Sequence, residues 1–372
     1  MQIRRLNALI VKEFFQIIRD PSSLLISVMM PLILMFIYGF GLSLDLDHIQ
    51  IGLVLEEDSK EASSFAASFC NSRYFDVHLG HSRQELERML ISGQIKGIVV
   101  VPSYFTAFLK SHTQVAPIQV IADGSEPNTA SFVQNYVQGV WGVWLQQEKI
   151  SSGFSGLPLV TTQTRYWYNE QLKSRNVLIP GSLAIILTLV GTLLTSLVVS
   201  REWERGTMEA IMSTPVTQIE LLLGKFIPYY LLALCSMCLC VFIALFLYDI
   251  PLRGSLFALW LVTTCFLFAA LSLGIFISAT SKTQLVASQW AITVGFFPAF
   301  MLSGFIFEIA SMPLWIQCFT YLIPARYFVT CLQTIFLVGD VWGLIIVELI
   351  PMSLLGASIF WLVLKKTAKR LD

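Results

Sequence analysis

Charged residues are scarce in this chain. Only 13% of its 372 residues are Asp, Glu, Lys or Arg, whereas soluble proteins carry about 25%. Hydrophobic residues reach 55% and the mean hydropathy is +0.71, so we predict an integral membrane protein. The 24 basic and 24 acidic residues cancel, and this zero net charge gives no support to a nucleic-acid partner.

The chain also lacks the motifs of common catalytic and metal sites. No G-x-x-x-x-G-K-[ST] loop is present, and Gly206-Thr207 and Gly224-Lys225 are isolated fragments of such a loop. The histidines have no acidic or cysteine partner at metal-ligand spacing. The seven cysteines, six of them in or beside apolar runs, do not suggest a disulfide scaffold. We therefore expect a chain that is not an enzyme and holds no cofactor or metal.

Long apolar runs are the main feature that is present. At roughly 20 residues, a run of this kind is long enough to cross a membrane as a helix. Six runs qualify: Leu24–Leu44 (preceded by a break at 20–22), Val177–Ser200, Phe226–Leu247, Leu256–Ile277, Leu285–Ile306 and Val341–Leu364.

A further apolar stretch, residues 312–338, differs from these runs. Pro313 and Pro324 divide it into half-length pieces, and Arg326 follows the second proline. Such pieces predict a re-entrant or interfacial hairpin rather than another full span. Glu348 is the one acid well inside an apolar run and is therefore a functional candidate. It lies about two helical turns from the end of that run, so pairing with a base or snorkelling to the interface fits equally well.

A polar segment, residues 45–175, separates the first two spans. Strand-like and helix-like stretches alternate through it, which predicts a small α/β domain packed outside the membrane. The expected strands are 49–57, 74–80, 95–102 and 117–123, and the expected helices are 59–70, 82–91, 103–111 and 128–149. The predicted fold class is an α-helical polytopic membrane protein with six transmembrane helices and this inserted extracytoplasmic domain.

Lysines and arginines give the orientation. Twelve of them flank the first span, the stretch after the second span, the 280–283 link and the C-terminus, against two in the short loops on the other side. By the positive-inside rule, both termini are cytoplasmic, including the tail 365–372. Residues 1–20 read as an amphipathic helix in the cytoplasmic interface, with Ile3, Leu6, Ile10, Phe14 and Ile17 on one face.

The segment 201–230, REWERGTMEAIMSTPVTQIELLLGKFIPYY, is the most charged stretch between two spans. Helical periodicity over 201–214 puts Trp203, Thr207, Met208, Ile211 and Met212 on one face and Arg201, Glu202, Arg205 and Glu209 on the other. Thr214-Pro215 should end this helix. Thr217 and Glu220 form a capping box that starts the next one.

Three segments together resemble the ABC-type exporter permeases of the type-2 membrane family. They are REWERGTMEAIMSTPVTQIELLLGKFIPY, RYWYNEQLKSRNVLIPG at the entry to the second span, and LSGFIFEIASMPLWIQCFTYLIPARYFV at the outer hairpin. The likeness covers essentially the whole chain. Glu308 departs from the family pattern, in which many relatives carry proline.

The resemblance implies a transmembrane subunit without its own ATPase, in a bacterial plasma (inner) membrane. ATP and Mg would be bound by a separate nucleotide-binding subunit, and a second permease subunit, identical or paralogous, would pair with this one. The segment contacting the ATPase would comprise Arg201, Glu202, Glu204, Arg205, Gly206, Thr207, Glu209, Thr214 and Pro215.

Cargo and envelope partners are hypotheses at this stage. Trp290, Phe296, Phe297 and Phe300 could line a path for a small lipophilic or amphipathic substrate, although such spacing is also that of packing or lipid-facing residues. The large outer domain could dock a periplasmic adaptor. Two functions of other classes remain as alternatives: an ion-coupled secondary transporter, or a membrane-anchored ligand-sensing module.

Overall fold

The computed structural model of the chain forms two compact units, one built from residues 1–44 and 165–372 and the other from 45–164. It describes residues 2–41, 48–72, 74–80, 82–110, 118–124, 127–151, 168–169, 173–281 and 283–366. Each unit is described by itself.

The smaller unit is an α/β domain around a four-stranded sheet. Strands β1 (Ile49–Leu55), β2 (Phe75–Gly80), β3 (Gly97–Val101) and β4 (Gln119–Ala122) lie in the order β2-β1-β3-β4. β1 is parallel to β2 and β3, while β4 is antiparallel to β3. These four strands were all predicted from the sequence.

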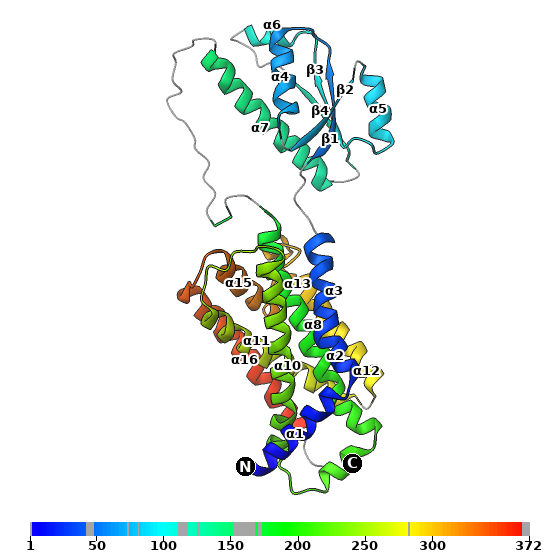
Figure 1. The fold of residues 1–372 in the computed structure, drawn as a ribbon, viewed down its shortest axis with the longest axis vertical. Coiled ribbons are helices and arrows are strands. Elements are labelled where there is room, and N and C mark those ends of the chain that lie inside the picture. Colours follow the sequence, from blue (N-terminus) through cyan, green and yellow to red (C-terminus); the bar gives the residue numbers. More distant parts are fainter. Residues whose placement is uncertain are drawn as a thin grey trace. The chain divides into compact units, whose positions relative to one another are not determined.

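Helices cover both faces of this sheet (Figure 1). They are α4 (Lys60–Cys70), α5 (Arg83–Ile91), α6 (Phe105–Lys110) and α7 (Pro127–Ser151). Phe65 and Phe69 of α4 pack with Trp144 of α7 over one face, and Leu86 of α5 packs over the other. β3 is buried along its whole length because both of its faces are covered.

Among its described residues, the larger unit contains six segments long and apolar enough to cross a membrane, as predicted. The first, 21–41, comprises α2 (Pro21–Leu24), a π-helical segment Leu25–Met29, α3 (Met30–Phe36) and a second π-helical segment Ile37–Gly41. The fifth, 284–302, comprises α12 (Gln284–Trp290), a π-helical segment Ala291–Phe296 and α13 (Phe297–Leu302). The others are α8 (Arg175–Glu204), α10 (Gln218–Phe246), α11 (Leu256–Thr280) and α16 (Trp342–Lys366).

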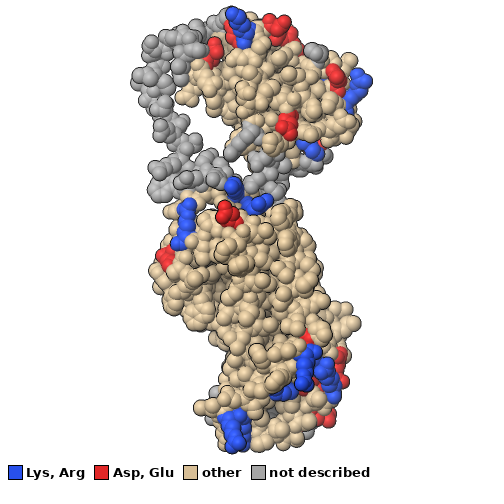
Figure 2. Space-filling view, in the orientation of Figure 1, with Lys and Arg blue, Asp and Glu red and all other residues tan. Residues whose placement is uncertain are grey.

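Charge is distributed along this unit as expected for a spanning bundle. On the face that Figure 2 shows, charged side chains gather at the two ends and an uncharged band lies between them. α1 (Ile3–Ile18) lies at one of these ends, where the start of α10 and the end of α16 also meet. Uncharged surface is what the hydrocarbon core of a bilayer requires.

α8 is the central helix of the bundle, because 94% of the residues in its most apolar 18-residue stretch are buried. Small residues let neighbouring helices approach it closely. A Cβ atom at Gly274 of α11 would lie 1.9 Å from Thr195 Oγ1 of α8. One turn further on, Ser278 Oγ of α11 accepts hydrogen bonds from the amides of Val199 and Ser200, at 2.8 and 2.9 Å.

The segment predicted as a hairpin consists of two short helices, α14 (Leu314–Thr320) and α15 (Pro324–Leu337). α15 packs into the bundle, with Phe328 stacked on Phe266 of α11 at 4.1 Å between ring centroids. The far end of α15 is bonded to the loop before α11, where the amide of Gly254 donates to Ile335 O at 2.8 Å. That this pair re-enters the membrane remains a prediction.

Candidate functional site

The segment 201–214 is not the single surface helix that its periodicity predicts. Arg201 to Glu204 form the last turn of α8, and a separate short helix, α9 (Thr207–Met212), follows. Gly206 separates them with φ +67°, a left-handed conformation that glycine adopts without strain. The capping box that starts α10 is present as predicted, with both Thr217–Glu220 hydrogen bonds formed.

The predicted exposure of the polar face is wrong at its first two residues. Arg201 and Glu202 retain only 4% and 3% exposure, and Met208 of the apolar face retains 1%. The charged side chains of Glu204, Arg205 and Glu209 are exposed, together with Thr214 and Pro215. Periodicity gives the polar direction of one helix but does not show which other helices pack against it.

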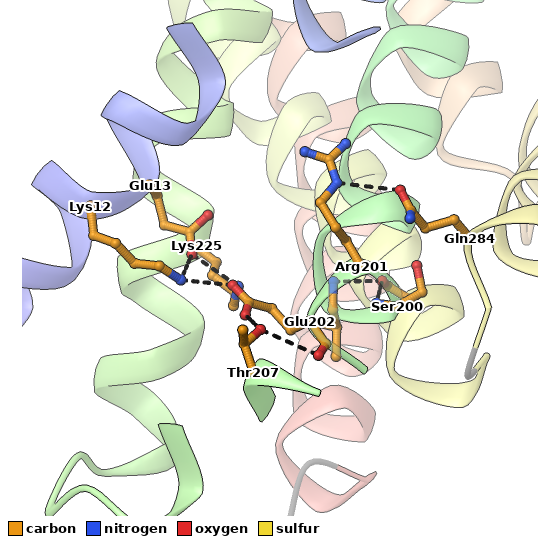
Figure 3. A network of polar contacts seen from close by, with 10 residues as sticks. Lys12, Glu13, Ser200, Arg201, Glu202, Thr207, Lys225 and Gln284 are labelled. Carbon is orange, nitrogen blue, oxygen red and sulfur yellow. Dashed lines mark hydrogen bonds and ion pairs between the residues drawn. The ribbon is translucent and has the colours of Figure 1, made fainter. Parts of the chain in front are cut away.

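Glu202 belongs to a buried ring of alternating charges (Figure 3). Its Oε1 lies 2.7 Å from Lys12 Nζ of α1 and 3.3 Å from Lys225 Nζ of α10. Glu13 Oε1 of α1 closes the ring, at 3.2 Å from Lys12 and 2.9 Å from Lys225. Thr207 of α9 donates a short hydrogen bond to the other oxygen of Glu202. We call these four charged residues the charge ring.

The charges of the ring stabilise one another. Burial alone would lower the pKa of Lys12, but Glu13 and Glu202 outweigh it and hold that pKa above its ordinary value. The side chains of Glu13, Glu202 and Lys225 are at least 96% buried, whereas that of Lys12 is 44% exposed. Two buried acids are therefore balanced by one buried and one half-exposed lysine.

A second cluster of polar contacts joins the end of α8 to Asp20, just before α2, and to α12. Arg201 Nη1 lies 2.6 Å from Asp20 Oδ2, and Arg201 Nε donates to Gln284 Oε1 of α12 at 3.3 Å. Asp20 also accepts hydrogen bonds from Ser22 and Ser23 at the start of α2. Burial would raise the pKa of Asp20, but the two serine hydroxyls and Arg201 lower it to about 2. Asp20 is therefore held as a carboxylate.

The beginning of α1 is fixed to the turn between α9 and α10. The amide of Gln2 donates to Glu220 Oε1 at 2.6 Å, and Arg5 Nη1 donates to Pro215 O at 2.6 Å. The ring also joins α1 to α8 and α10, so α1 contacts the helices on both sides of α9.

A groove of about 360 Å³ lies between α1 and α9, beside the charge ring. Its lining is mostly apolar, with Lys12 and Arg205 as its basic side chains and Glu202 as its acid. Four of the predicted contact residues line it: Glu202, Arg205, Thr207 and Thr214. Glu209 is exposed but does not line the groove.

Sequence reasoning missed four charged members of these clusters: Lys12, Glu13, Asp20 and Lys225. The sequence did contain a signal for Lys225. This lysine stands in the otherwise apolar stretch LLLGKFIPYY, whose helix should be buried or lipid-facing, so its charge needs a partner. Glu13 gave a similar signal, because it lies on the same helical face as Leu6 and Ile17, which are buried.

The four aromatic residues proposed to line a substrate path do not share one surface. Phe296 and Phe300 stack at 5.6 Å between centroids, and Phe300 lies 6.5 Å from Tyr38 of the first span. Trp290 and Phe297 are about half exposed, at 54% and 51%. The structure thus places Phe300 against the first span, with Phe296 stacked on it, and Trp290 and Phe297 on the outside of this chain.

Comparison with known proteins identifies the family to which the chain belongs. The model of the family described as "ABC-2 family transporter protein" matches residues 21–365. The chain belongs to the ABC-2 family of transporter proteins. Among its ABC-2 relatives, the Escherichia coli K12 protein named "Probable multidrug ABC transporter permease YbhS" is 46% identical, over 99% of this chain and 98% of its own length.

Two further relatives have similar names. "Probable multidrug ABC transporter permease YbhR" of E. coli K12 is 28% identical over 90% of both chains. "ABC transporter G family member 20" of Dictyostelium discoideum is 23% identical over 91% of this chain, which spans 48% of that protein. This chain is thus a multi-pass membrane protein of the ABC transporter permease type, and the term multidrug comes from the names of its E. coli relatives.

Since α9 depends on the left-handed residue before it, Gly206 gives a first prediction. Gly206→Val should destabilise the protein by about 1–2 kcal/mol, because a β-branched residue is strained at positive φ. Gly206→Asn should cost less, since asparagine tolerates this conformation. Thermal unfolding of the two purified variants compares these costs, and equal midpoints would mean that the left-handed turn is not required.

Proposed function

We propose that this chain is the membrane-spanning subunit of an ATP-driven exporter, and that the charge ring transmits movement from a separate ATPase subunit into the bundle. One observation carries the proposal: three charged residues at least 96% buried join α1, α8 and α10 at the charged end of the bundle, beside α9. Such an arrangement costs desolvation energy, so a positional role explains it better than stability alone.

The ATPase subunit would bind ATP and Mg and contact the surface formed by α9 and the groove. This surface offers exposed charges at Glu204, Arg205 and Glu209, and charge complementarity of this kind favours specific docking. Movement of α9 would reach Glu202 through Thr207, and movement of α1 would reach it through Lys12. α8 would then carry it to the spans packed around it.

The same proposal includes the orientation of the chain in the membrane, its partners and its cargo. Both termini and the charge ring lie in the cytoplasm, and the α/β unit lies outside, where it could receive a periplasmic adaptor. A second permease subunit, identical or paralogous, pairs with this one in the membrane, in contact with lipids. The cargo is a small lipophilic or amphipathic molecule taken from the cytoplasm or the inner leaflet. Its path would pass the stacked pair Phe296 and Phe300, of which Phe300 lies beside Tyr38 of the first span.

Charge reversal at the exposed surface tests the docking step. Arg205→Glu combined with Glu209→Lys should reduce the ATPase subunit that copurifies with the chain and reduce export, because both side chains are exposed and would face the partner. Membrane insertion and the thermal unfolding midpoint should change little, since exposed charges contribute only about 0–1 kcal/mol.

Lys366→Glu is the matched control, because Lys366 is also exposed and its helix ends beside α9 and α10. It should leave copurification and export unchanged. If the Arg205/Glu209 variant binds the ATPase subunit and exports as well as this control, the docking surface lies elsewhere and the proposal fails.

A further inference from the structure

β2 is an edge strand of the α/β unit. In the described part of the chain it stands at one end of the strand order β2-β1-β3-β4, so β1 pairs with one of its sides and no strand pairs with the other. Edge strands are commonly protected by lysine, proline or a bulge. β2, with the sequence FDVHLG, has neither lysine nor proline, and it pairs with β1 in unbroken register. Its outer side is therefore suited to pairing with another strand.

The register with β1 shows which backbone groups of β2 point away from the sheet. Ile49 is aligned with Phe75, and its amide donates to Tyr74 O at 2.9 Å. In a parallel pair, alternate residues bond to the neighbouring strand, and in β2 these are the even-numbered ones. The amides and carbonyls of Val77 and Leu79 therefore point outward, and within the described residues they form no hydrogen bond. They are the groups that an added strand would bond.

The sequence of β2 is complementary to itself. A second copy of the strand, antiparallel and centred on Val77, would place Asp76 opposite His78 and Phe75 opposite Leu79. The outward-pointing residues would then form hydrogen-bonded pairs. Asp76 and His78 would form a non-hydrogen-bonded pair, in which side chains approach most closely. A two-fold axis through Val77 would produce the Asp76–His78 pair twice.

The side chains of β2 are available for such pairing. Asp76, His78 and Leu79 are exposed, Leu79 to 63%, although it belongs to a strand. One carboxylate oxygen of Asp76 lies 3.1 Å from Nδ1 of His48 in the same copy. The other oxygen can accept from the imidazole N–H of His78 in the second copy. Cross-strand pairs of opposite polarity and of apolar residues both stabilise a sheet.

We propose that two copies of this chain pair through β2, antiparallel and centred on Val77, so that their two sheets become one continuous sheet. The partner at this edge is thus an identical subunit. This inference specifies the second permease subunit of the proposed function, and it rests on that function for the presence of a pair. It requires neither the ATPase subunit nor the cargo.

Cysteine pairs test the register in the full-length chain. Cys70, which is exposed in the same unit, is first replaced by serine. Two differently tagged copies, one with Asp76→Cys and the other with His78→Cys, are co-expressed, purified and oxidised with copper phenanthroline. Their Cα atoms should lie about 4.5 Å apart, within the range that a disulfide spans. We expect a cross-link between the two tags.

Same-residue pairs are the matched control for this register. Two copies that both carry Asp76→Cys, or both carry His78→Cys, place their cysteines at diagonal positions about 7–8 Å apart. A disulfide does not bridge that separation without backbone movement. The cross-link should therefore be lost in both same-residue combinations.

Val77→Pro, introduced into both tagged copies, tests whether the backbone makes the contact. Proline removes the central outward amide but leaves the bonds to β1, which the even-numbered residues form. Proline is tolerated where an edge strand faces solvent, so the thermal unfolding midpoint should change little while the cross-link is lost. Val77→Thr keeps the amide and the β-branched shape, and should retain the cross-link.

Copurification of the two tags is scored separately from cross-linking. Tags that copurify without the Asp76–His78 cross-link, or with equal cross-linking in the same-residue pairs, would overturn the pairing through β2 and leave the proposed pair of subunits intact. Tags that do not copurify would also overturn it, because the partner would not be an identical copy. The proposed ATP-driven coupling is decided independently by the Arg205/Glu209 variant.

Discussion

Lys225→Met is expected to destabilise the protein by about 3–5 kcal/mol, the usual cost of removing one partner from a buried ion pair. Without Lys225, the buried carboxylates of Glu13 and Glu202 would share Lys12, which is itself half exposed. One negative charge would then be buried without compensation. The measurement is the thermal unfolding midpoint of the purified variant, together with export in cells.

Lys12→Met is the matched comparison within the same ring. It should cost less than Lys225→Met, because Lys12 is 44% exposed and water can partly replace it. Adding Glu13→Gln to Lys225→Met should recover stability, since the unbalanced charge is removed. A Lys225→Met protein as stable as the wild type, or one that Glu13→Gln does not rescue, would show that the ring is not held by its charges.

The spans and the α/β unit could be predicted because their signals are local. A run of about 20 apolar residues has few other structures available to it, and β1 and β3 are short apolar runs between helix-like stretches. The capping box at Thr217 and Glu220 is equally local, since its two hydrogen bonds depend on residues three positions apart.

The charge ring could not be predicted in this way. Its lysines and glutamates come from α1, α8 and α10, and contacts such as Lys12–Glu202 join residues 190 positions apart. A polar face on one helix is compatible both with solvent and with an internal ion pair. Only the packing of three helices decides between them, and here it buries Glu202 while leaving Glu209 exposed.

The central position of α8 is a similar case. Each span of this chain is mostly apolar, because both lipid and the protein interior accept apolar side chains. Hydropathy therefore cannot distinguish a buried helix from a lipid-facing one. The informative residues are small and polar. Thr188, Thr192 and Thr195 are buried in α8, and each donates its hydroxyl hydrogen bond to a carbonyl four residues earlier.

Gly274→Leu should also destabilise the protein strongly, because it separates α11 from α8. A Cβ at this position would lie 1.9 Å from Thr195 Oγ1 and 2.6 Å from Thr192 O, and the second atom is backbone that cannot rotate away. Overpacking a close contact typically costs 1–3 kcal/mol and more where backbone must shift. We expect a lower unfolding midpoint and loss of export.

Gly343→Leu in α16 is the matched control, since nothing lies within 4 Å of a Cβ placed there. The same glycine-to-leucine change at that position should leave the unfolding midpoint and export close to those of the wild type.

The displaced helix in Gly274→Leu carries Ser278, which accepts from the amides of Val199 and Ser200 just before Arg201 and Glu202. If the close contact of α8 and α11 is needed to carry movement from the charge ring, adding Thr195→Ala should recover only part of the stability and little export, because Thr192 O still keeps the helices apart. Recovery of both, or an unaffected Gly274→Leu protein, would show that α8 does not depend on this contact.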